Sequence, residues 1–142
     1  MILIIEDDPD IAEVLRYSLE SENLETRVAL TGEEGLSASL DKHNPPSLIL
    51  LDLLLPRMSG IEICRRLRKE AQTRTTPVVI VTAKASDNDI RISQELGVAD
   101  YIMKPFSVRE VIARVNSLLN ETESRHNRGE PKQVSRRGSS RC

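Results

Sequence analysis

Residues 48–56 read LILLDLLLP, a run of apolar side chains interrupted only by the aspartate at position 52. A strand that is buried on both faces has this near-continuous apolar composition, whereas a half-buried strand alternates apolar and polar side chains. The run therefore predicts a central strand of a parallel sheet with helices on both faces. Asp52 would stand at the end of that strand, where an ionisable side chain is unusual.

Short apolar runs alternate with amphipathic stretches along the rest of the chain as well. The alternation predicts an α/β fold of the flavodoxin-like kind, with a (βα)5 order and a doubly wound, parallel, five-stranded sheet in the strand order 2-1-3-4-5. We expect the strands at residues 3–5, 26–30, 48–51, 78–81 and 101–103.

Helix signals separate the expected strands. Asp8 is a suitable N-cap, and Pro9 stands at the first helical position, where proline is favoured. Capping-box spacing predicts two further helix starts, at Thr31 with Glu34 and at Ser107 with Glu110. Glycines bound two more predicted helices: residues 61–70 follow Gly60, and residues 87–96 end before Gly97.

The length of 142 residues suits one domain. From residue 121 onwards apolar side chains almost vanish, and this stretch holds six Lys or Arg but three Asp or Glu. We expect a domain over residues 1–120 and a polar, basic linker or disordered tail over residues 121–142.

The composition excludes several classes of function. The part before residue 121 is mildly acidic, so it lacks the basic surface that binds nucleic acid, and DNA would be bound through an effector domain that is not evident in this chain. Two cysteines, Cys64 and Cys142, form no disulfide framework or metal motif, which favours the cytoplasm. The apolar start, residues 2–5, is too short to cross or enter a membrane.

Acidic residues follow two expected strands whose ends meet. In a sheet of this order, ligands bind beyond the carboxyl ends of the strands, at the switch between the first and third. Glu6, Asp7 and Asp8 follow the first strand, and Asp52 ends the third. Each acid alone would more often be an ordinary solvated side chain. Converging carboxylates repel one another unless a cation lies among them, and oxygen ligands beside a phosphate favour Mg2+.

A carboxylate can also attack phosphorus to form an acyl phosphate if nearby groups neutralise the phosphoryl oxygens. Thr82 closes the fourth strand and Lys104 the fifth, so a hydroxyl and an ammonium are expected at the same edge. The strand ends read IIEDD at 4–8, LILLDLLLPRMSG at 48–60, VTA at 81–83 and YIMKPF at 101–106. Together these strings, over roughly residues 1–120, resemble the CheY-like receiver domain of two-component response regulators, and the OmpR/PhoB-like group in particular.

The resemblance implies that a sensor histidine kinase phosphorylates Asp52, so that the protein is a phosphoacceptor switch rather than an enzyme. It implies Mg2+ as the cofactor and leaves Asp8 to cap a helix. The implied metal ligands are Glu6, Asp7, Asp52 and the backbone carbonyl of Leu54, while Thr82 and Lys104 match the groups that contact the phosphoryl oxygens.

The resemblance further implies a cis peptide before Pro105 and a conformational switch. In the family, the threonine matched by Thr82 moves toward the phosphoryl group and an aromatic matched by Tyr101 turns inward; Tyr101 could instead be an ordinary strand aromatic. Four charged residues resemble those that pair two receivers in the family, and they predict a homodimer on phosphorylation: Arg91, Asp100, Glu110 and Arg114. Ala99 departs from the family, which often has an acid at that position.

Other classes of protein fit the sequence less well. A flavin or nucleotide carrier of this fold would present Ser, Thr or Gly after the first strand, where this chain has three acids. A phosphohydrolase with an aspartyl nucleophile would have an acid in place of Leu54. Two outputs stay open: a stand-alone receiver that docks to a partner, and part of a longer transcription regulator.

Overall fold

The computed structural model describes residues 1–128, with side chains described through residue 121. Five strands alternate with five helices in this part of the chain. The elements are β1 (Ile2–Ile5), α1 (Pro9–Glu20), β2 (Thr26–Ala29), α2 (Gly32–Ser39), β3 (Leu48–Leu51), α3 (Gly60–Lys69), β4 (Val78–Thr82), α4 (Asp87–Glu95), β5 (Asp100–Met103) and α5 (Val108–Arg128).

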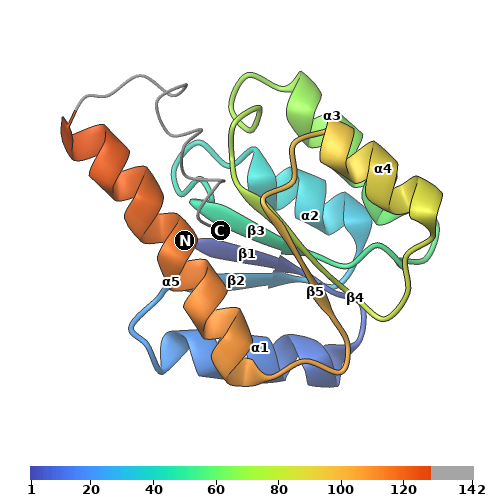
Figure 1. Cartoon of the computed structure of the whole chain (residues 1–142), viewed down its shortest axis with the longest axis horizontal. Helices are drawn as coiled ribbons and strands as arrows, with labels where there is room; N and C mark the ends of the chain where they lie inside the picture. Colours follow the sequence, from blue (N-terminus) through green and yellow to red (C-terminus); the bar gives the residue numbers. More distant parts are fainter. Residues whose placement is uncertain (129–142) are drawn as a thin grey trace.

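The strands form one parallel sheet in the order β2-β1-β3-β4-β5, which confirms the predicted topology. Helices α1 and α5 cover one face, and α2, α3 and α4 cover the other (Figure 1). Each strand lies within one residue of its predicted bounds. The apolar runs were sufficient to place the strands because the sheet is covered on both faces.

Each face of the sheet has its own hydrophobic core. Leu3 and Ile5 of β1 point toward α2 and α3, whereas Ile2 and Ile4 pack toward α1 and α5. Successive side chains of a strand point to opposite faces, so both sets are buried. All residues of β1, β3 and β4 are buried, which gives the middle of the sheet two dry faces.

The predicted helix starts are largely confirmed. The Asp8 side chain caps α1 and accepts the Asp10 N–H at 2.9 Å. The Thr31 hydroxyl accepts the Glu34 N–H at 3.1 Å, but the Glu34 carboxylate accepts from Leu30 N–H rather than from the cap itself. The predicted capping box is therefore half formed, because the returning side chain reaches one residue further back.

Helix α5 begins at Val108 and runs through Arg128, past residue 120, where we expected the domain to end. The rest of the expected tail, residues 129–142, lies outside the described residues. Within the described part of the chain, no helix is long and apolar enough to cross a membrane.

Candidate functional site

The parallel register brings the ends of four strands together at one edge of the sheet. Ile5 pairs with Leu51, so Glu6 and Asp52 leave adjacent strands side by side. The N–H of Asp52 donates to the carbonyl of Ile5 at 3.1 Å, which carries the sheet hydrogen bonding to the site itself. In the same way, the N–H of Lys104 donates to the carbonyl of Thr82 at 2.9 Å.

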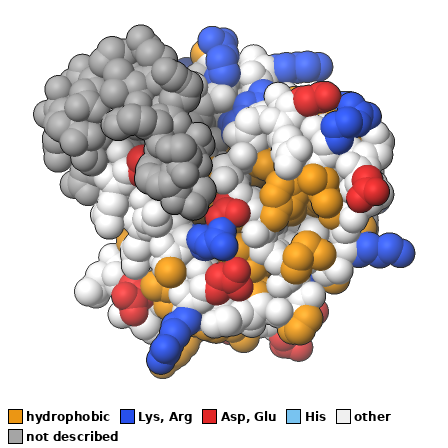
Figure 2. All heavy atoms as spheres, viewed as in Figure 1, with side chains coloured by type: hydrophobic (Ala, Val, Ile, Leu, Met, Phe, Trp, Pro, Cys, Tyr) orange, Lys and Arg blue, Asp and Glu red, His pale blue; other side chains and the backbone are white. Residues whose placement is uncertain are grey.

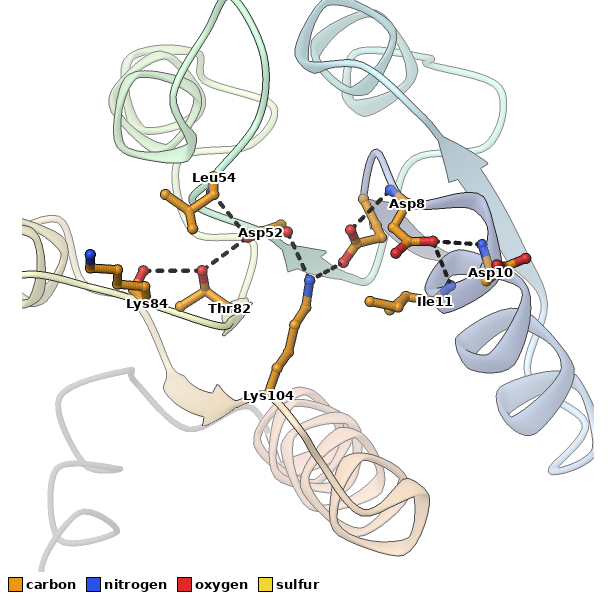
Figure 3. A network of polar contacts seen from close by, with 9 residues as sticks. Asp8, Asp10, Ile11, Asp52, Leu54, Thr82, Lys84 and Lys104 are labelled. Atoms are coloured by element: carbon orange, nitrogen blue, oxygen red, sulfur yellow. Dashed lines mark hydrogen bonds and ion pairs between the residues drawn. The ribbon is translucent and has the colours of Figure 1, made fainter.

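Asp52 lies at the centre of the site and is 4 % exposed. Its Oδ1 accepts the Thr82 hydroxyl at 2.9 Å and the Leu54 N–H at 3.0 Å, and its Oδ2 accepts the Lys104 ammonium at 2.9 Å (Figure 3). The carboxylate is thus held in one orientation by three donors from three strand ends. Such donors replace the water that a carboxylate loses when it is buried.

Glu6 shares the Lys104 ammonium with Asp52. Its Oε1 lies 2.9 Å from Lys104 Nζ, and its Oε2 accepts the Asp8 N–H at 3.1 Å. Burial raises the pKa of Glu6, and the hydrogen bonds from Lys104 and from the Asp8 backbone offset this only partly, so the pKa lies above its ordinary value.

Lys104 shows the opposite balance. Burial lowers the pKa of its ammonium, but hydrogen bonds to Glu6 and Asp52, and the charges of these acids, outweigh burial and raise the pKa above its ordinary value. The lysine is therefore charged at neutral pH. It occupies the place between the two buried acids where a cation is needed.

Three of the predicted metal ligands form a cluster. Carboxylate oxygens of Glu6, Asp7 and Asp52 all lie within 4.8 Å of one another, with Asp7 exposed and the other two buried. An all-carboxylate set with one solvent-facing member suits Mg2+, which prefers oxygen ligands and keeps several waters. Leu54 follows on the loop after β3, and the metal role of its carbonyl stays a prediction.

The predicted switch aromatic, Tyr101, belongs to β5, and its side chain reaches α4. Tyr101 is half-buried, and its hydroxyl donates to the Ile90 carbonyl of α4 at 3.0 Å. Burial raises the pKa of this phenol. The contact joins a strand-five residue to α4, and the switching role of Tyr101 stays a prediction. The Lys104–Pro105 peptide is cis, as the resemblance implied.

The charged residues of the predicted dimer face pair within the protomer. Arg114 contacts Asp100 and also Glu110, whose Oε2 lies 3.7 Å from its Nη2, and Arg91 bonds to Glu95 on its own helix at 3.1 Å. Figure 2 shows charged side chains beside apolar ones over this side of the molecule. The sequence predicts that these charges are available to a second copy. In this protomer they already have partners.

Two features of the site region were not foreseen. A Cβ on Gly60 would lie 2.5 Å from the carbonyl oxygen of Asp52, so this glycine allows α3 to start against the strand that carries the site. Ser86 and Asp89 form a reciprocal capping box at the start of α4. The Ser-x-x-Asp spacing could have revealed the second feature, whereas the first has no signal beyond a loop glycine.

Comparison with known proteins agrees with this geometry. A model of the response regulator receiver domain matches residues 2–116. Response regulator ArlR of Staphylococcus saprophyticus is 42% identical over 83% of this chain and 51% of its own length, and the DNA-binding response regulator MtrA of Mycolicibacterium smegmatis is 41% identical over 86% of this chain and 51% of its own. Both are of the OmpR/PhoB type.

The chain spans about half the length of the curated relatives it matches. Solved structures match over nearly their whole length. A CheY-like receiver domain from Methanospirillum hungatei has a TM-score of 0.81 at 32% identity and covers 87% of this chain and 95% of that one. The receiver domain of Francisella response regulator 1452 has a TM-score of 0.75 at 35% identity, with coverages of 85% and 97%.

Proposed function

The chain belongs to the response regulator receiver family, and we propose that it accepts a phosphoryl group on Asp52 from a sensor histidine kinase. The observation that carries this proposal is the set of donors around Asp52, since Lys104, Thr82 and the Leu54 N–H all converge on one buried carboxylate. These donors are oriented before any phosphoryl group arrives, which lowers the cost of organising the site during transfer.

In the proposed transfer, an oxygen of Asp52 attacks the phosphorus of a phosphohistidine, the new P–O bond forms, and the P–N bond breaks to release the imidazole. Lys104 would leave Asp52 Oδ2 to neutralise the phosphoryl oxygens, and the Thr82 hydroxyl would turn from Oδ1 to another of them. Each of these groups needs to move by little, because both already contact the acceptor carboxylate.

Glu6, Asp7 and Asp52 would hold Mg2+, with the Leu54 carbonyl as a further ligand. The bound cation would supply positive charge to the phosphoryl oxygens as negative charge accumulates there. Both oxygens of Glu6 already accept hydrogen bonds, whereas Asp7 faces solvent. Asp8 is engaged in capping α1, so we exclude it from the metal site.

Downstream of Asp52, we propose that Tyr101 and Thr82 change the surface formed by α4, β5 and α5 and thereby promote a homodimer. The relatives include a DNA-binding response regulator about twice as long as this chain, which supports an output in transcription through an effector domain. Residues 1–120 would then be the receiver, acting in the cytoplasm, and residues 121–142 the connection. A stand-alone receiver that docks to a partner is the alternative.

The test is intact-mass spectrometry after incubation with acetyl phosphate, with and without Mg2+. We expect a single phosphoryl adduct that needs Mg2+ and disappears in Asp52→Asn. Asp7→Ala should slow its formation far more than Asp8→Ala. An adduct that persists in Asp52→Asn, or equal losses in the Asp7 and Asp8 variants, would contradict the assignment.

A further inference from the structure

The C-terminal end of α4 packs on a core shared with α3 through Leu96 and Val98, and the Arg68 side chain of α3 adds hydrogen bonds to it. Its Nε donates to the Leu96 carbonyl at 2.7 Å, and its Nη2 donates to the Gly97 carbonyl at 3.3 Å. Carbonyl groups at a helix C-terminus lack intrahelical partners and carry partial negative charge, so a guanidinium there satisfies both needs.

The same guanidinium also holds the loop between α3 and β4. Its Nη1 donates to the carbonyls of Thr73 and Thr76, at 3.1 and 2.9 Å. Thr73 is itself buried, and its hydroxyl donates to the Leu67 carbonyl of α3. Arg68 therefore connects α4 to the loop after α3, which the buried hydrogen bond from Thr73 to Leu67 holds on α3.

The other end of α4 is connected to the site. The Thr82 hydroxyl lies 2.9 Å from Asp52 Oδ1 and 3.3 Å from the carbonyl of Lys84, which belongs to the loop that leads into α4. The helix itself is lightly packed, since Ser93 is its one buried residue in the described structure. A helix with little buried surface can move at low cost, so its end contacts decide how it moves.

We propose that Arg68 is the pivot of the switch: it holds the C-terminal end of α4 on α3 while phosphorylation at Asp52 moves the N-terminal end. The inference rests on the proposed function, because it concerns the response to that phosphorylation. Arg68 is a positioning residue in this account and takes no part in the chemistry. It contacts the end of α4 that lies away from the Thr82–Lys84 contact.

Amide hydrogen exchange measured by NMR tests the pivot residue by residue. Ile90, whose N–H bonds to the Ser86 carbonyl, reports on the N-terminal half of α4, and Leu96, Gly97 and Val98 report on the C-terminal end. In the resting protein, Arg68→Met should speed exchange at the last three amides about tenfold or more. The control is Arg65→Met, because Arg65 is an exposed arginine of α3, the helix that also carries Arg68. This control should leave the exchange of Leu96, Gly97 and Val98 unchanged.

The second arm uses the wild-type protein with beryllofluoride and Mg2+. Exchange should change at Ile90 and stay the same at Leu96, Gly97 and Val98, whereas in Arg68→Met the change should spread to all four. Arg68→Lys, which keeps the charge with fewer donors, should fall between. Equal changes at both ends of wild-type α4, or an Arg68→Met variant that exchanges like Arg65→Met, would overturn the proposal.

Phosphorylation separates this inference from the proposed function. Arg68→Met should form the Asp52 adduct at a rate within about twofold of wild type, since Arg68 makes no contact with the site. If wild-type protein forms no adduct, the proposed function fails, and the resting-state comparison still decides whether Arg68 holds the end of α4.

Discussion

The middle of the sheet and the α4–β5 side differ sharply in how firmly they are held. Strands β1, β3 and β4 are buried at every residue, and Thr82 at the end of β4 bonds to Asp52 at the end of β3. Lys104, which follows β5, reaches across to pair with Asp52 and Glu6. In contrast, β5 has one fully buried residue, Ile102, α4 has Ser93, and their charged side chains lie at the surface. The proposed phosphoacceptor site therefore stands on a rigid platform of buried strands, whereas the surface proposed to respond to phosphorylation is loosely packed.

The largest predicted difference concerns the ion pairs of the two regions. Lys104 is 14% exposed and pairs with acids that are 3% and 5% exposed, so Lys104→Met would leave two buried carboxylates without their cation. We expect the free energy of unfolding to fall by about 3–5 kcal/mol in metal-free protein at neutral pH. Added Mg2+ should restore a large part of it, because the metal ligands remain.

Arg114→Met is the matched change on the other side, since that arginine also pairs with two acids but is 42% exposed. Its loss should cost about 0–1 kcal/mol. Urea unfolding of both variants, with and without Mg2+, measures the contrast. Equal losses in the two variants would mean that the site is no more tightly organised than the surface.

A second pair of variants probes the backbone. A Cβ on Gly60 would lie 2.5 Å from the Asp52 carbonyl oxygen and 2.6 Å from the Leu53 Cα, so Gly60→Ala must displace the end of β3. We expect a loss of up to about 3 kcal/mol together with slower phosphorylation. Gly97→Ala meets no atom within 4 Å but has a φ of +73°, which should cost about 1 kcal/mol.

Thermal unfolding and acetyl phosphate kinetics of these two glycine variants give the readout. We expect slow phosphorylation in Gly60→Ala and a normal rate in Gly97→Ala. A normal rate in Gly60→Ala would show that the position of Asp52 tolerates movement of β3.

The pH dependence of stability provides a smaller effect at the site. Glu6 has a pKa raised above 4.5, so its protonated form is favoured by folding. Such a group adds stability below pH 4.5 that is lost as pH rises through the folded pKa. Glu6→Gln imitates the protonated form throughout. In metal-free protein, the unfolding free energy of wild type relative to Glu6→Gln should therefore decrease from pH 4.5 upwards. A relative increase over that range would mean that the Lys104 contact outweighs burial.

The sequence was sufficient for the sheet and for the gathering of the site residues. Apolar runs located β1, β3 and β4 because these strands are buried throughout, and a parallel sheet must place Glu6, Asp52 and Thr82 at one edge. The partners of the arginine side chains could not be predicted in this way. Arg114 meets Asp100 from 14 positions away, and Arg68 reaches Leu96 from 28 away, so both contacts depend on how helices pack.

The smallest predicted effects are those of the dimer face. Since Arg91 already bonds to Glu95, and Glu110 to Arg114, a dimer must exchange these pairs for pairs between protomers. Each exposed pair is worth about 0–1 kcal/mol and occurs twice in a two-fold dimer, so Arg91→Glu or Glu110→Arg should weaken a beryllofluoride-induced dimer by at most about thirtyfold. The double charge swap should recover part of that loss.

Sedimentation velocity with beryllofluoride and Mg2+, at low and high salt, measures this series. Raising the salt should weaken the wild-type dimer, because exposed charges are screened. A protein that stays monomeric at high concentration would favour the stand-alone receiver that docks to a partner.

The most direct test of the rigid platform as a phosphoacceptor site is chemical mapping of the modified residue. Borohydride reduces an aspartyl phosphate to homoserine, which peptide sequencing by mass spectrometry then locates. After treatment with acetyl phosphate and Mg2+, we expect homoserine at position 52 and at no other aspartate, and we expect none when Mg2+ is withheld. Homoserine at position 7 or 8, or an equal yield without Mg2+, would contradict the assignment of Asp52 as the acceptor.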